Sequence, residues 1–244
     1  MMRICGIIIS IINLEGIIVN TRLNRILFDF DGTLILHNKQ NEGMEIATLL
    51  DIPIELQPEF SRRLQNFFSS SQNKKYFSRY RVTYELYLEA LEGIMGPLTD
   101  FNVSPKQVVE AIDTKAKYYS ILATGAVETL EYLKGKGYTM AVFTNGFYDM
   151  QMDILKYKGL DQYFYKLFAW DNFWAKPHKR AFERALDGTD PIYNVMIGDD
   201  PLNDIKPAKE LGMLTVGINF RVKTTEKTKP QRMINKLTDL MKIL

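Results

Sequence analysis

The sequence predicts an α/β protein with a doubly wound parallel sheet and an inserted helical segment, and two observations carry this prediction. From about residue 121 onward, short apolar runs alternate with amphipathic helical stretches, as in a parallel sheet with helices on both faces. Before that, the stretch from Arg25 to Thr33 begins as a short apolar run and ends in carboxylates and a glycine, and it is followed by roughly ninety residues with helical spacing and almost no β-branched runs. We interpret this stretch as a helical domain inserted into the sheet core.

The first twenty residues are rich in isoleucine and stand apart from the rest of the chain. Asn13 and Glu15 interrupt the apolar run, which is far shorter than the ~20 residues of a membrane span. No small-residue cleavage pattern follows it, as one would in a signal peptide. We therefore expect residues 1–20 to be an extra strand or an N-terminal extension outside the core, and the protein to be soluble.

The rest of the chain divides into a core and a cap. We assign residues 21–36 and 121–244 to the core and residues 37–120 to the cap. Three amphipathic stripes predict the cap helices, and Ser104 and Gln107 have the spacing of a reciprocal capping box at the start of the third. The stripes are Phe60, Leu64, Phe67 and Phe68; Tyr84, Tyr87, Leu88, Leu91 and Met95; and Val108, Ile112, Ala116 and Tyr119.

Helices and strands alternate in the second part of the core. The pattern predicts helices at 126–134, 148–158, 177–186 and 204–211, and strands at 138–143, 167–170, 194–197 and 214–217. Apolar residues with helical spacing after Pro230 predict a terminal helix, namely Met233, Leu237, Leu240, Met241 and Leu244. Together with the strand that begins at Arg25, these elements predict a Rossmann-like core.

The composition excludes several classes of protein. Apolar residues make up 46% and charged residues 25%, which excludes a disordered or collagenous chain. The net charge of +2 gives no electrostatic reason to expect nucleic acid or a membrane as a partner. A single cysteine, Cys5, excludes an intramolecular disulfide framework and a cysteine-rich zinc site, and suits the cytoplasm. With only His37 and His178 available, we expect the chemistry to depend on carboxylates.

Four polar clusters lie where an open parallel sheet binds its ligands, beyond the C-terminal ends of the strands. Three of them follow an apolar run and one opens a helix. They are Asp29 with Asp31, Thr144 with Asn145, Lys176, and Asp199 with Asp204. Crowded carboxylates repel one another unless a divalent cation lies among them, and an all-oxygen site favours Mg²⁺. A hydroxyl, a backbone amide and a lysine are the donors that a phosphate requires.

In this order and spacing, the clusters resemble the four motifs of the haloacid dehalogenase-like (HAD) phosphatase superfamily. The motifs read Asp29-x-Asp31-Gly-Thr33, Thr144 after a strand, Lys176-Pro177, and Gly198-Asp199-x3-Asn203-Asp204. The resemblance extends from about residue 25 to residue 218. It implies that Asp29 is the nucleophile, which forms an aspartyl-phosphate, and that Asp31 serves first as general acid and then as general base.

The resemblance also implies roles for the other motif residues. Mg²⁺ would be held by the Asp29 carboxylate, the Asp31 backbone carbonyl and Asp199. The phosphate-binding residues would be Thr33, Thr144, Asn145 through its backbone amide, and Lys176, whereas Asp204 would orient Lys176 or a metal-bound water. By contrast, we expect Asp200 to be a solvated turn residue and Asn203 to be the N-cap of the next helix.

The position of the helical insert marks the subgroup with a helical cap, which closes over the site and selects the substrate. The run 144–147, with Gly159-Leu160 and Tyr163-Phe164 after it, resembles the branch that contains 5′-nucleotidases. Cap aromatics could stack on a base and cap arginines could reach the substrate, or they could form the cap core and its solvated face. These residues are Phe67, Phe68, Tyr76, Phe77, Tyr80, Arg62, Arg63, Arg79 and Arg81. Trp170, Phe173 and Trp174 could line the entrance, although packing under a loop is the simpler interpretation.

We therefore expect a Mg²⁺-dependent phosphatase that hydrolyses a small phosphorylated metabolite, with a nucleoside 5′-monophosphate as one candidate. A sugar phosphomutase, another HAD hydrolase such as a 2-haloacid dehalogenase, and a catalytically silent phosphate-binding module stay open as alternatives. A dehalogenase needs no proton donor at position 31, so Asp31 favours phosphoryl transfer. The sequence leaves the substrate and the oligomeric state open.

Overall fold

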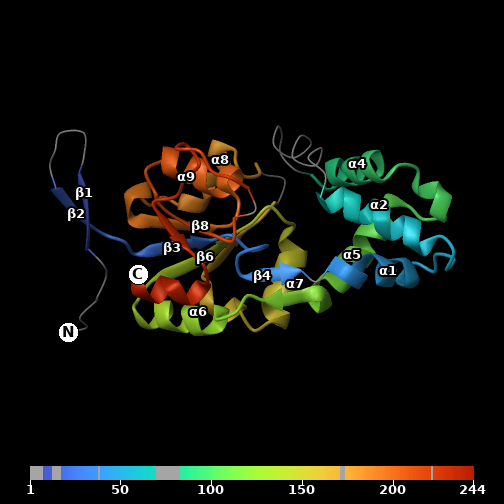
Figure 1. Cartoon of the computed structure of the whole chain (residues 1–244), viewed down its shortest axis with the longest axis horizontal. Helices are drawn as coiled ribbons and strands as arrows, with labels where there is room; N and C mark the ends of the chain where they lie inside the picture. The colour runs from blue at the N-terminus through green and yellow to red at the C-terminus, as the bar shows by residue number, and fades with distance from the viewer. Residues whose placement is uncertain (1–7, 13–17, 38, 70–82, 171–173, 221) are drawn as a thin grey trace.

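The computed structural model describes residues 8–12, 18–37, 39–69, 83–170, 174–220 and 222–244. Its centre is a six-stranded sheet in which each neighbouring pair is parallel (Figure 1). The strand order is β10 (Arg232–Ile234), β9 (Leu214–Ile218), β8 (Asn194–Gly198), β3 (Arg25–Phe28), β6 (Thr139–Phe143) and β7 (Lys166–Phe168). The chain winds outward from β3 in both directions, which confirms the predicted doubly wound sheet.

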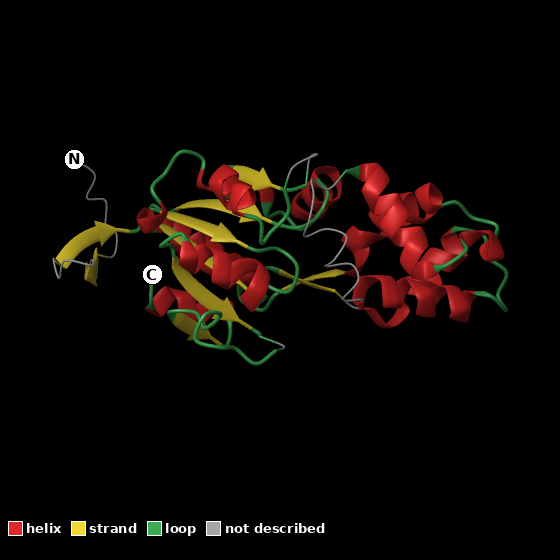
Figure 2. Cartoon of the chain, turned by 90° about the horizontal axis from the view of Figure 1, so that it is seen from above, coloured by secondary structure: helices red, strands yellow, loops and turns green. Residues whose placement is uncertain are grey.

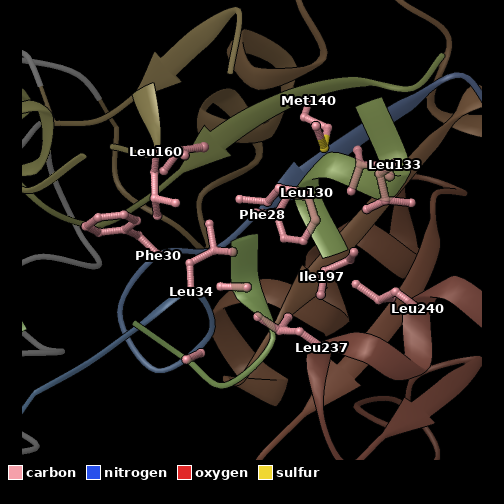
Figure 3. Close-up of a cluster of buried hydrophobic side chains, with 14 of the residues drawn as sticks. Phe28, Phe30, Leu34, Leu130, Leu133, Met140, Leu160, Ile197, Leu237 and Leu240 are labelled. Atoms are coloured by element: carbon pink, nitrogen blue, oxygen red, sulfur yellow. The ribbon is translucent and has the colours of Figure 1, made fainter. Parts of the chain in front are cut away.

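Strand β3 is buried on both faces because helices cover the sheet on each side. Ile26 and Phe28 belong to one apolar cluster and Leu27 to another, as the two-residue repeat of a strand requires. The first cluster includes side chains of α6 (Ala126–Gly135), α7 (Tyr148–Tyr157) and the 3₁₀ helix η5 (Leu237–Lys242), and Figure 3 shows part of it. The second includes α8 (Lys179–Leu186) and α9 (Lys206–Glu210).

The register of the central strands fixes the position of the site. Phe28 is paired with Val142 of β6 and with Ile197 of β8, so these three strands end at the same level. The Asp29 amide continues the ladder by donating to the Ile197 carbonyl at 2.8 Å. The residues that follow β3, β6 and β8 therefore share one edge of the sheet.

A helical region lies at one end of the molecule (Figures 1 and 2). It contains α1 (Lys39–Leu49), α2 (Gln57–Ser69), α4 (Tyr84–Met95), η1 (Leu98–Phe101) and α5 (Pro105–Tyr119), which pack around a separate apolar cluster. The capping box predicted for the third stripe is present at the start of α5. An antiparallel pair, β4 (Ile35–His37) and β5 (Ser120–Leu122), connects this region to the core.

The predicted helix at the C-terminal end is wrong in its first part. Residues 232–234 form β10 beside β9, and Met233 is exposed on it. The Asp239 carboxylate accepts hydrogen bonds from the amides of Asn235 and Lys236, each at 3.2 Å, so the helical turns begin only at Leu237. Leu237, Leu240 and Leu244 are buried as the pattern required.

The isoleucine-rich N-terminal segment contains two antiparallel strands, β1 (Ile8–Ile12) and β2 (Ile18–Arg22). They form a two-stranded sheet of their own, apart from the central sheet. Within the described ranges, no helix is both long enough and apolar enough to cross a membrane.

Candidate active site

The four predicted clusters meet at the C-terminal edge of the sheet. Asp29 follows β3, Thr144 follows β6 and Asp199 follows β8, while Lys176 lies on the segment that leads into α8. Carboxylate oxygens of Asp29, Asp199 and Asp204 all lie within 4.8 Å of one another. Residues that are far apart in the sequence therefore form a single acidic site.

Lys176 lies at the centre of this site. Its Nζ donates to Asp29 Oδ1 at 2.7 Å and to Asp204 Oδ1 at 2.6 Å, and its side chain is only 2% exposed. Burial disfavours the charged ammonium, but Asp204 and Asp29 outweigh this effect and hold the pKa of Lys176 above its ordinary value. The lysine is therefore a fixed positive charge against the candidate nucleophile.

One ammonium cannot neutralise three carboxylates, of which Asp29 and Asp204 are buried and Asp199 is half-buried. Burial raises the pKa of Asp199 to about 8 and that of Asp204 to about 7, and the charge of Asp29 adds to both shifts. Burial likewise raises the pKa of Asp29, although Lys176 opposes this shift. The excess negative charge and the all-oxygen donor set fit a hard divalent cation such as Mg²⁺.

Two motif glycines give these carboxylates the room they occupy. Gly32 has a φ of +89°, which favours glycine, and a Cβ there would lie 2.2 Å from Asp199 Oδ2. A Cβ on Gly198 would lie 2.3 Å from Asp204 Oδ2. Each glycine therefore allows the close approach of a carboxylate to the backbone.

Asp31 lies in the turn beyond the end of β3, where the Gly32 amide donates to the Ile35 carbonyl at 2.7 Å. Its Oδ2 accepts a hydrogen bond of 3.1 Å from Nε2 of Gln151 on α7. The motifs did not identify Gln151. The sequence feature that could have pointed to it is its place on one face of the helix: an uncharged polar residue three and four positions before Ile154 and Leu155, which are buried.

The side chain of Asn145 has a role that the motif did not predict. Its Nδ2 donates to the Lys176 carbonyl and its Oδ1 accepts from the Lys176 amide, both at 2.8 Å. The same Oδ1 accepts from Trp170 Nε1 at 3.3 Å. Asn145 therefore links the loop after β6 to the segment that carries Lys176.

The two threonines assigned to phosphate binding are both buried. Thr33 Oγ1 donates to Asp29 Oδ2 at 3.3 Å, so in this structure its hydroxyl contacts the candidate nucleophile. The Thr144 amide donates to the Phe168 carbonyl at 2.9 Å and fixes the start of the loop after β6.

The helix after Asp199 begins earlier than predicted, and the assignments of Asp200 and Asn203 were wrong. Asp200 Oδ1 accepts from the amides of Leu202 and Asn203 at 2.8 and 3.1 Å, so Asp200 is the N-cap. Asn203 Nδ2 donates to Asp200 Oδ2 at 2.8 Å. The helical turns therefore start at Pro201, with a π-helical segment (Pro201–Ile205) before α9.

Aromatic side chains join the helical region to the loops of the site. The ring of Phe147, next to the Thr144 loop, lies 4.9 Å from that of Tyr87 on α4 and 5.4 Å from that of Trp170. Trp170 is buried, as the packing interpretation requires. Trp174 stacks on His178 at 3.9 Å, whereas Phe173 lies outside the described residues.

The cap residues considered for substrate binding have other contacts where they are described. Phe67 is buried against Tyr87, and Phe68 lies beside Phe67. Arg62 and Arg63 both pair with Glu59, and Arg63 also pairs with Asp100. These contacts favour the structural alternative for those four residues. The others, Tyr76, Phe77, Tyr80, Arg79 and Arg81, lie outside the described residues.

A parallel α/β core with this acidic edge defines a class of hydrolases, and comparison with known proteins identifies the class. The family model described as haloacid dehalogenase-like hydrolase matches residues 26–218, and the chain belongs to this family. The predicted superfamily is therefore confirmed. The chain is an enzyme, a hydrolase of the phosphatase kind.

The relatives are similar over most of their length. Pyrophosphatase PpaX of Halalkalibacterium halodurans is 25% identical, over 91% of this chain and 97% of the relative. Glyceraldehyde 3-phosphate phosphatase of Pyrococcus furiosus is 27% identical, over 82% of each chain. Among solved structures, the magnesium-bound HAD-hydrolase YfnB of Bacillus subtilis has a TM-score of 0.69 and 21% identity, over 92% of this chain and 99% of YfnB, and this likeness concerns the fold.

Proposed function

We propose that this protein is a Mg²⁺-dependent phosphatase that hydrolyses a small phosphomonoester through an aspartyl-phosphate on Asp29. The observation that carries the proposal is the buried Lys176 ammonium held between Asp29 and Asp204, with Asp199 in the same cluster. Burial raises the pKa of Asp29, and the Lys176 ammonium opposes this shift and so favours the ionised carboxylate that a nucleophile requires. The phosphatases among the relatives support the same class of reaction.

In the first step, an oxygen of Asp29 attacks phosphorus and forms a new P–O bond while the bond to the leaving oxygen breaks. Asp31 gives its proton to that oxygen, and the alcohol departs. In the second step, Asp31 takes a proton from water as the water oxygen attacks phosphorus, which releases inorganic phosphate and restores the Asp29 carboxylate. The Thr144 hydroxyl and the Asn145 amide bind the phosphoryl oxygens.

Asp29 and Asp199 would hold Mg²⁺, together with the backbone carbonyl of Asp31. When bound, Mg²⁺ supplies positive charge that offsets the charge of the phosphoryl group. Asp204 positions Lys176 through the 2.6 Å hydrogen bond, and Lys176 in turn faces Asp29. Gly32 leaves the space that the Asp199 carboxylate occupies.

Residues 37–120 would act as the cap that covers the site and selects the substrate. The resemblance of the run 144–147 to the nucleotidase branch makes nucleoside 5′-monophosphates one candidate class, and small sugar phosphates are another. Because a single cysteine suits a reducing compartment, we place the activity in the cytoplasm.

The test is turnover of p-nitrophenyl phosphate and a panel of nucleotide and sugar phosphates, with Mg²⁺ and with EDTA. We expect release of phosphate that depends on Mg²⁺ and is lost in EDTA. Equal rates in both conditions would contradict the metal requirement. Binding of Mg²⁺ and phosphate without turnover would favour the silent module, and isomerised sugar phosphate in place of free phosphate would favour a mutase.

A further inference from the structure

We propose that Gln151 is a positioning residue that orients Asp31 for both of its proton transfers. The inference rests on the proposed function, because Asp31 exchanges protons only in that reaction. Gln151 lies in the first turns of α7, and its side chain reaches the turn after β3. It therefore connects two parts of the site that are 120 positions apart in the sequence.

The contact is built into the structure. Gln151 is 1% exposed, and its Nε2 donates to Asp31 Oδ2 at 3.1 Å. A Cβ on Gly146 would lie 2.2 Å from that Nε2, so the glycine leaves the space through which the amide passes. The backbone N–H of Gln151 donates to the Phe147 carbonyl at 3.0 Å, which holds the residue in the helix.

The Asp31 carboxylate determines which way the side-chain amide of Gln151 is turned. Gln151 Oε1 is buried and has no hydrogen-bond partner within the described part of the chain, an arrangement that costs stability. If the amide were turned over, Oε1 would face Asp31 Oδ2, and the two acceptor oxygens would repel each other whenever Asp31 is ionised. The contact with Asp31 therefore determines how the side chain is placed.

A neutral donor suits a residue that alternates between acid and base. The N–H of Gln151 can donate to an oxygen of Asp31 whether Asp31 is protonated or ionised, and Gln151 itself neither gains nor loses a proton. A cation in this place would favour the ionised carboxylate and oppose the acid step. The hydrogen bond restricts rotation of the carboxyl group, so that Asp31 meets the leaving oxygen and the attacking water in a fixed orientation.

The test compares two substrates with different leaving groups. Loss of kcat/KM reports the first step, in which an alkyl phosphate needs the proton from Asp31 much more than p-nitrophenyl phosphate does. For Gln151→Met, we expect kcat/KM to fall ~10-fold or more on glycerol phosphate and less than ~3-fold on p-nitrophenyl phosphate. Gln162→Met is the matched control, because Gln162 is exposed and its side-chain Nε2 donates to the nearby Gly159 carbonyl.

A second variant tests whether Gln151 positions Asp31 or only stabilises the fold. In Gln151→Glu, the side chain keeps its size but a carboxylate oxygen takes the place of the Nε2 donor. At one fixed pH, its kcat/KM should again fall more on glycerol phosphate than on p-nitrophenyl phosphate, and this variant also decides the matter if Gln151→Met does not fold. Equal losses on both substrates would overturn the inference. A parent enzyme without activity on any phosphate would overturn the proposed function, and the inference with it.

Discussion

At the scale of single residues, the site depends on how one ammonium is shared among several carboxylates. Lys176 bonds to Asp29 and Asp204 at once, and burial strengthens both interactions. Removing one carboxylate therefore leaves the lysine with its other partner. A variant that lacks one of these carboxylates can therefore lose activity while the fold stays stable.

The variant Asp29→Asn tests the nucleophile directly. We expect turnover of p-nitrophenyl phosphate to fall at least ~10³-fold, because a carboxamide does not form the aspartyl-phosphate. The melting temperature should be unchanged or higher, since Lys176 keeps Asp204 and the repulsion between Asp29 and Asp199 is removed. Thermal melting and the phosphatase assay check both points, and an active variant would remove Asp29 from its proposed role.

At the scale of elements, the helical region meets the core through α4 and the loops after β6 and β7. Trp170 is central to this contact, because its ring packs on Phe147 and Tyr87 and its Nε1 donates to Asn145. Asn145 in turn holds the segment that carries Lys176. Packing between the two regions therefore supports the position of a site residue.

A pair of substitutions at Trp170 separates packing from hydrogen bonding. Trp170→Phe removes the donor to Asn145 and should lower the free energy of unfolding by about 1 kcal/mol. Trp170→Ala also removes the buried ring and should lower it by about 3–5 kcal/mol. Denaturant unfolding measures both values. If the two variants lost equal stability, the ring contacts with Phe147 and Tyr87 would contribute little.

At the scale of the whole molecule, the predictions succeeded where a local signal and the topology agreed. Asp29, Thr144 and Asp199 each follow an apolar run, and a parallel sheet brings such ends together whatever lies between them in the sequence. Gln151 could not be found in this way, because it lies within α7 and not at the end of a strand, and no motif marks it.

Local sequence patterns gave wrong predictions where the same residues were compatible with two different structures. Asp200 and Asn203 are both good N-caps, and only the structure shows that the Asp200 carboxylate receives the amides. Met233 and Leu237 are spaced as in a helix, yet Met233 belongs to an edge strand. Hydrogen bonds within one turn decided the first case, and pairing with the neighbouring strand β9 decided the second.

The stability of the whole chain should depend on pH and on Mg²⁺ together. The folded pKa values of Asp199 and Asp204, about 8 and about 7, lie above the ordinary value of 3.8. The folded state therefore binds more protons than the unfolded state between about pH 4 and 8, so stability falls as the pH rises through this range. In EDTA, we expect the melting temperature to decrease from pH 5 to pH 8.

Mg²⁺ should reverse this trend, because it competes with protons for the same oxygens and binds only the folded chain. The rise in melting temperature on adding Mg²⁺ should be larger at pH 8 than at pH 5, and smaller in Asp199→Asn at either pH. A Mg²⁺ effect that is the same at both pH values would contradict the coupling between the cation and these two carboxylates.

The three glycines at positions 32, 146 and 198 have a consequence for redesign. None of them carries chemistry, yet any side chain added at one would displace Asp199, Gln151 or Asp204 respectively. Libraries that diversify the surroundings of this site should therefore leave these three codons untouched, because even a methyl group there would displace one of these side chains.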